Sequence, residues 1–119
     1  MTTLDQAFAA LKAAEVAAEK SNQLFNKLLK LTRDFAEVKE RANEEASRLA
    51  FIVEISDFVA NDVSAAAAAA DKAQEVALAV KTAFNFATDA TKIAKIAAAE
   101  ADLVAAKAAL TVAELEKFS

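Results

Sequence analysis

In the second half of the chain, small and large apolar residues recur at alternating spacings of four and three residues. An α-helix has about 3.6 residues per turn, so this spacing places the repeated residues on one helical face. The pattern predicts a long helix whose repeated face packs against another helix, as in a coiled coil. We call this face the seam. Its residues are Ala73, Ala77, Val80, Phe84, Ala87, Thr91, Ala94, Ala98, Ala101, Ala105, Ala108, Val112 and Leu115.

The first half of the chain carries a less regular stripe at similar spacings. Its start has the pattern of a helix N-terminus, because Thr3 followed by Gln6 fits a capping box and Asp5 suits the first turn. The stripe continues across residues 31–34 with a small shift of phase. This continuity favours a helix that runs through these residues. Its predicted members are Leu4, Phe8, Leu11, Val16 or Ala18, Phe25, Leu28, Phe35, Val38, Ala42, Leu49 and Ile52.

A turn signal lies near the middle of the chain, at residues 56–64. Asn61 tolerates the left-handed conformation that ends helices, and Asp62 or Ser64 could cap the next helix. The sequence therefore predicts one all-helical domain over residues 1–119. Arm one is expected over residues 3–57, the turn over 57–64 and arm two over 64–118.

Two all-α folds fit this division. The first is a long antiparallel helical hairpin that packs into a multi-helix assembly. The second is an up-down four-helix bundle with turns near residues 32, 60 and 88, in which Asp34 and Glu37 would cap a helix. The continuous phase of both arms favours the hairpin.

Arm two also carries large apolar residues away from its seam. A two-helix hairpin has nothing to cover them, so we expect them to be exposed within one chain and buried against another copy. The alternative is a four-helix bundle that covers both faces within one chain. We call this set the second stripe, and it is the predicted assembly interface: Phe86, Ile93, Ile96, Leu103 and Leu110.

Composition supports the helical interpretation. The chain contains no glycine, no proline and 34 alanines among its 119 residues. Alanine is the best helix former, while glycine and proline usually interrupt helices. We therefore expect helix over more than about 85% of the chain, against a usual third. The segment 49–59 is apolar on nearly every side, which predicts a buried end of the fold near the turn.

The residues for most catalytic chemistry are missing. Without histidine or cysteine, catalytic triads, thiol chemistry and histidine-ligated metal sites cannot form. The carboxylate pairs Glu15–Glu19 and Asp71–Glu75 are expected to be solvated, as are the ion pairs Glu37–Arg41 and Glu44–Arg48. We expect no enzymatic activity, no cofactor and no metal.

Charge and hydropathy narrow the range of partners. The net charge of −4 argues against a nucleic-acid partner, and no apolar run reaches the roughly 20 residues of a membrane-spanning helix. The start of the sequence lacks a basic leader followed by an apolar run, so no secretory signal is expected. The compartment is not indicated.

These expectations lead to three functional hypotheses. The leading one is a non-catalytic structural subunit of a coat, filament or scaffold, whose partner is another copy of itself. The second is an amphipathic helical protein on a lipid or polymer-granule surface. The third is a stand-alone helical bundle, natural or designed. In composition the chain resembles several Ala-rich helical groups, including phasin-like granule coats, helical coat or filament subunits and designed bundles, without a motif that selects one.

Overall fold

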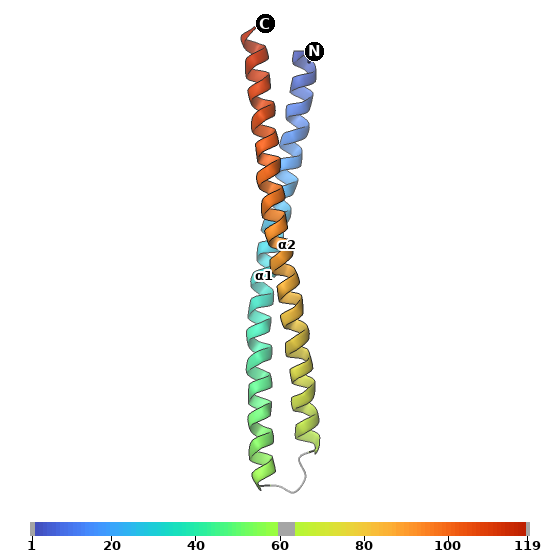
Figure 1. Ribbon diagram of the computed structural model, residues 1–119, viewed down its shortest axis with the longest axis vertical. Coiled ribbons are helices and arrows are strands. Elements are labelled where there is room, and N and C mark those ends of the chain that lie inside the picture. Colours follow the sequence, from blue (N-terminus) through green and yellow to red (C-terminus); the bar gives the residue numbers. More distant parts are fainter. Residues whose placement is uncertain (1, 60–63, 119) are drawn as a thin grey trace. The chain divides into compact units, whose positions relative to one another are not determined.

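The computed structural model describes the backbone of residues 2–59 and 64–118 and the side chains of residues 2–55 and 64–118. It contains two long helices, α1 over Leu4–Val59 and α2 over Ser64–Lys117 (Figure 1). They have 56 and 54 residues, which together exceed the predicted 85% of the chain. No β-strand occurs in the described ranges. The fold is an antiparallel helical hairpin, as the phase of the two arms predicted.

Helix α1 begins with the predicted capping box. The backbone N–H of Thr3 donates a hydrogen bond to Gln6 Oε1 at 2.9 Å, and the backbone N–H of Gln6 donates to Thr3 Oγ1 at 3.2 Å. This exchange satisfies two backbone donors that have no partner within the helix. Asp5 lies in the same turn, where its negative charge faces the positive end of the helix dipole.

Helix α1 ends at Val59 and helix α2 begins at Ser64, and both of these bounds lie inside the predicted turn interval 57–64. Helix α1 continues to Val59, two residues beyond the end predicted for arm one. The four-helix alternative is wrong, because Thr32 and Thr88 lie inside the continuous helices α1 and α2. The proposed end-capping roles of Asn61 and Asp62 fall on residues 60–63, which lie outside the described residues.

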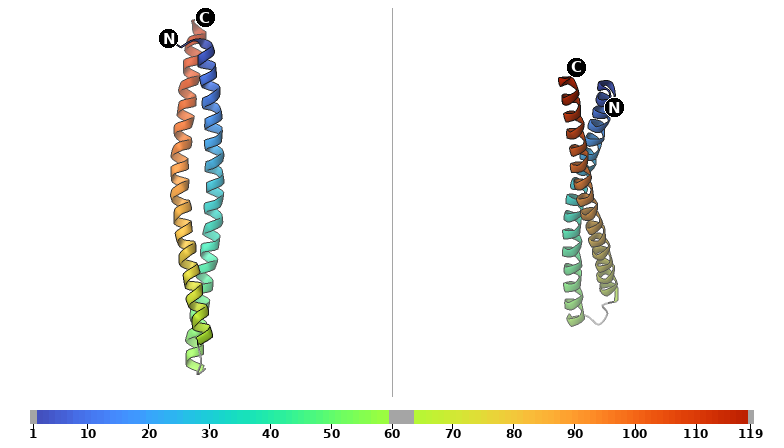
Figure 2. Two further views of the ribbon diagram at one scale, coloured as in Figure 1. Left: turned by 90° about the vertical axis from the view of Figure 1, so that its right-hand side faces the viewer. Right: turned by 45° about the horizontal axis from the view of Figure 1, so that its top comes forward.

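Two compact units can be distinguished within the hairpin. The first unit consists of the residues up to Leu29 together with those from Ala90 onward, and the second spans Lys30–Asp89. In each unit a segment of α1 runs antiparallel beside a segment of α2, and Figures 1 and 2 agree on this pairing. Each unit is described by itself below.

In the first unit, small side chains form the contact between α1 and α2. The α2 seam contributes Ala94 and Ala98, which are buried, and α1 contributes Ala7, Ala14 and Ala18. Small residues on both helices allow the backbones to approach closely. Two polar links also join the helices: Thr91 Oγ1 donates to the carbonyl oxygen of Leu28 at 3.2 Å, and Asn22 Nδ2 donates to Asp102 Oδ1 at 3.0 Å.

The second unit has a similar alanine core with different polar links. Ala46, Ala77 and Ala87 are buried. Thr32 Oγ1 donates to the carbonyl oxygen of Ala87 at 3.1 Å, and Lys39 Nζ lies 4.7 Å from the centre of the Phe84 ring. The second of these contacts is a cation–π interaction, which contributes about 0.5–1 kcal/mol at an exposed site.

The predicted seam of α2 is confirmed, because all thirteen of its positions are buried or half-buried. The predicted stripe of α1 is wrong at two positions, since Phe8 and Val38 are 45% and 44% exposed. Of the two alternatives Val16 and Ala18, the packed residue is Ala18, which is 8% exposed, while Val16 is 43% exposed. The observed positions keep a regular spacing of three and four residues without a phase shift, and many are small or polar. They are Leu4, Ala7, Leu11, Ala14, Ala18, Ser21, Phe25, Leu28, Thr32, Phe35, Lys39, Ala42, Ala46 and Leu49.

The physical reason for this correction is that α1 carries bulky apolar residues on more than one side. Selecting the bulkiest residue in each turn mixed two faces and created the apparent shift of phase. The packed face is determined instead by the small seam of α2, which needs a regular face opposite it.

Candidate assembly interface

Four residues of the second stripe lie in the first unit, and all are exposed. Ile93, Ile96, Leu103 and Leu110 have 68%, 60%, 54% and 60% of their surface accessible. Val104, on the same part of α2, is 57% exposed. The sequence prediction that these residues are uncovered within one chain is confirmed, whereas their burial against a second copy stays a prediction.

The fifth predicted residue, Phe86, belongs to the second unit. Its side chain is 72% exposed, more than any of the other four. Phe84, two residues earlier on the seam, is only half-buried and lies against Lys39. A difference of two positions turns a side chain about 200° around a helix, so the two rings point to different sides of α2.

The second stripe lies on the side of α2 away from its contact with α1. At about 100° per residue, the midline of residues 93, 96, 103 and 110 lies roughly 160° from the midline of the seam. Burial follows the same division, since Ala94 and Ala98 are 6% and 4% exposed and Ile93 and Ile96 are 68% and 60% exposed. Ile93 and Ile96 therefore face outward, while Ala94 and Ala98 face α1.

Charged residues occupy the remaining positions of this outer face. Glu100 and Lys107 lie between the aliphatic residues at the same spacing, and both are exposed. Between Ile93 and Leu110 the outer face is therefore an interrupted apolar stripe with one negative and one positive position. An ordinary solvated helix face would carry polar residues where Ile96 and Leu103 lie.

The outer face of α1 in the same unit differs in character. Lys20, Gln23 and Lys27 lie there and are exposed, with Val16 as the large apolar exception. A shallow groove of about 540 Å³ beside Val16 is lined by alanines and by Lys12 and Lys20. The first unit thus presents a mostly polar side on α1 and an aliphatic side on α2.

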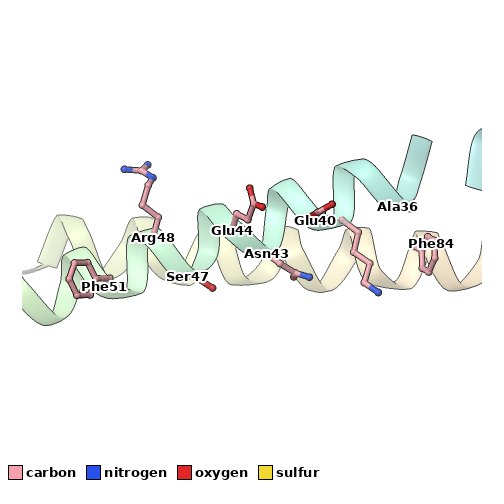
Figure 3. Close-up of a pocket in the computed structure, with 9 residues that line it drawn as sticks. Ala36, Glu40, Asn43, Glu44, Ser47, Arg48, Phe51 and Phe84 are labelled. Atoms are coloured by element: carbon pink, nitrogen blue, oxygen red, sulfur yellow. The ribbon is translucent and has the colours of Figure 1, made fainter. Parts of the chain in front are cut away.

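The second unit contains a larger open groove, of about 810 Å³. Eight of its nine lining residues come from α1, and α2 contributes Phe84. In Figure 3, Phe51 and Phe84 lie at opposite ends of the groove, and Glu40, Glu44 and Arg48 extend from the turns of α1 between them. The groove is a mixed surface of two aromatic rings and charges of both signs, open to solvent.

Arg48 pairs with a different residue from the one that the sequence predicted. Its partner is Glu45, which accepts a hydrogen bond from Arg48 Nε at 3.0 Å and a second from the guanidinium Nη2. This hydrogen bonding holds the pKa of the Glu45 carboxyl below its ordinary value, and the Arg48 charge acts in the same direction. The prediction of a Glu44–Arg48 pair is therefore wrong, because the spacing of three residues brings Glu45 within reach as well.

The apolar segment near the turn is only partly covered in the described residues. Leu49, Ile52 and Val53 are half-buried, while Phe51 and Ile55 are 61% and 46% exposed. The predicted burial on every side is therefore wrong for residues 51 and 55. The side chains of residues 56–59 lie outside the described set.

The carboxylate pairs singled out from the sequence are solvent-exposed. Glu19 Oε1 accepts a hydrogen bond from Gln23 Nε2 at 3.4 Å, and Glu75 Oε2 lies 3.8 Å from Lys72 Nζ. No group of three or more potential metal ligands occurs within residues 2–59 and 64–118. In those same ranges neither helix has a stretch apolar enough to cross a membrane.

The described fold and its exposed second stripe are the features that bear on function. Comparisons of the chain with protein-family models, with curated proteins and with solved structures find no match.

Proposed function

We propose that this chain is a non-catalytic structural subunit that assembles with copies of itself through the second stripe of α2. The observation that carries the proposal is the exposure of Ile93, Ile96, Leu103 and Leu110, each at 54% or more, along one side of a helix. Full burial of such a side chain contributes about 1.5–3 kcal/mol relative to exposure. Burial of these four side chains on one side of the helix would provide a substantial driving force for association.

The difference between the outer faces of the two helices supports association through the outer face of α2. In the first unit α1 exposes Lys20, Gln23 and Lys27 on its outer side, so association by that side would bury charge without a designated partner. The α2 side loses mostly aliphatic surface on association. Contact between two α2 helices is therefore favoured over other pairings of these faces.

The alanine seam leaves the second stripe available for this role. Because α1 packs against seam residues such as Ala94 and Ala98, the residues of the second stripe are not needed for the hairpin itself. Within the described residues, α1 packs against the seam and leaves the second stripe uncovered. Scaffold, coat and filament subunits share this property of being completed by their neighbours.

The test is sedimentation of the full chain over a wide concentration range, with a variant that introduces negative charges into the second stripe. Ile96→Glu combined with Leu103→Glu should shift the protein to monomer, since each glutamate would become an unpaired buried charge. Helix content by circular dichroism should stay unchanged, because both positions are exposed in the single chain.

The matched control is Ala13→Glu combined with Gln23→Glu, which adds the same charge at exposed positions on the outer side of α1. This variant should assemble as the wild type does. A wild-type chain that remains monomeric at every concentration would contradict the proposal, and a monomer that binds and gains order on lipid vesicles would favour a surface-coating function instead.

A further inference from the structure

We infer that two copies pair through α2 in an antiparallel arrangement about a two-fold axis level with Ala98, so that Ile93 of one copy lies opposite Leu103 of the other. This inference rests on the proposed function and adds the direction and register of the contact. It follows from the order of charged and apolar residues on the outer face of α2.

The outer positions of α2 are read from its helical periodicity alone. They follow one another at steps of three and four residues, as the seam does on the other side, and all of them are exposed. Apolar and charged side chains share the face in an order that is not symmetric from end to end. Between residues 86 and 114 they are, in sequence order, Phe86, Asp89, Ile93, Ile96, Glu100, Leu103, Lys107, Leu110 and Glu114.

A parallel pair in register would place every outer position opposite itself. Asp89, Glu100 and Lys107 would then each face an identical charge in the second copy. Like charges opposite one another at a helix contact are destabilising, and more so as water is excluded. The parallel two-fold arrangement therefore carries a like-charge layer at each of these positions.

The antiparallel pair centred at residue 98 avoids these layers. Asp89 then lies opposite Lys107 of the second copy, and Phe86 lies opposite Leu110. The Ile93–Leu103 pair lies closer to the axis, where each contact occurs twice by symmetry. At the centre Ile96 faces Glu100, whose aliphatic stem can lie along the isoleucine while its carboxylate reaches the solvent edge.

Charge complementarity also selects this register over its two neighbours. Sliding one helix by a heptad in one direction places Asp89 opposite Glu114, and sliding it in the other direction places Asp89 opposite Glu100. Both shifts create an acid–acid contact and break the Asp89–Lys107 pair. Of these three registers, the one centred at residue 98 pairs Asp89 with a base.

The chain contains no cysteine, which permits a direct test by disulfide trapping. Ile93→Cys and Leu103→Cys are made as separate single variants, one with a mass tag, and are oxidised alone and as an equal mixture. A disulfide requires Cα atoms closer than about 7 Å. The mixture should give mostly the 93–103 heterodimer, while each variant alone should give at least about tenfold less disulfide because like positions lie about 15 Å apart along the axis.

Controls separate this inference from the proposed function. A Lys95→Cys variant, exposed but off the second stripe, should give no disulfide with either partner. Homodimers of the 93 and 103 variants would show parallel pairing. Mixtures of Ile93→Cys with Leu110→Cys or with Ile96→Cys test the two shifted antiparallel registers, which a preferred 93–110 or 93–96 disulfide would show. Either result, or no trapping in variants that still sediment as oligomers, would overturn the inference and leave the proposed function standing. A monomeric wild-type chain would overturn the proposed function itself.

Discussion

At the scale of single residues, hydrogen-bonding side chains mark both the start of α1 and the contact between the helices. Thr3 and Gln6 exchange hydrogen bonds with each other's backbone N–H groups. Thr32 and Thr91 each donate a hydrogen bond to a carbonyl of the opposite helix within their own unit. Such groups fix where a helix starts and which turns face each other, because a displaced hydroxyl would lose its acceptor.

Substitution Thr3→Ala should destabilise the start of α1 by about 0.5–2 kcal/mol, the usual effect of losing an N-cap side chain. The backbone N–H of Gln6 would lose the acceptor Thr3 Oγ1, and only the hydrogen bond from the backbone N–H of Thr3 to Gln6 Oε1 would remain. Amide hydrogen exchange of residues 4–7 is the measurement, with Thr2→Ala as control. Equal acceleration in the two variants would show that the capping box does not hold the helix end.

At the scale of the helices, α2 separates its side chains by size. The seam holds alanines such as Ala98, which is 4% exposed, and the second stripe holds isoleucine and leucine at 54–68%. A bulky seam would keep the backbones apart, whereas alanine allows close approach with less apolar area buried in each layer. The hairpin therefore depends on a tight fit along the seam more than on large core residues.

This close fit makes the seam intolerant of larger side chains. Ala98→Leu should lower the free energy of unfolding by about 1–3 kcal/mol, because the added methylene and methyl groups have no space between the helices. Ala13→Leu, on the exposed outer side of α1, is the control and should change stability by less than about 0.5 kcal/mol. Urea unfolding of both variants is the measurement, and equal stability would contradict a close-packed seam.

At the scale of the whole molecule, each helix has one partner, and the aliphatic side of α2 stays uncovered in the single chain. The described residues contain no polar side-chain atom that is buried without a hydrogen-bond partner. The buried polar side-chain atoms therefore have hydrogen-bond partners, whereas large apolar side chains of α2 remain exposed to solvent. Association would bury these apolar side chains without breaking the hydrogen bonds.

Assembly should link stability to chain concentration. If the native state is an oligomer, mass action raises the Tm as the concentration increases, since partner binding stabilises the folded state. Calorimetry over a hundredfold range of concentration should show a rising Tm for the wild type. The variant with Ile96→Glu and Leu103→Glu should show a constant one. A concentration-independent Tm in the wild type would indicate a self-sufficient hairpin.

Several features of this protein could be predicted from local sequence. Helix formation follows from 34 alanines and the absence of glycine and proline, and the capping box follows from Thr3 and Gln6. The seam of α2 was predictable because its strict spacing leaves one candidate face for close packing. The exposure of Ile93 and Leu103 followed from that spacing, since a hairpin supplies a single partner for each helix.

The face of α1 that packs against α2 was decided by tertiary structure. Apolar residues lie on several sides of α1, so hydrophobicity alone favoured Phe8 and Val38, while the folded chain uses Ala7 and Lys39. The close approach set by the alanines of α2 selects a face with small side chains and regular spacing. Even a lysine fits there, because the ring of Phe84 receives its ammonium group.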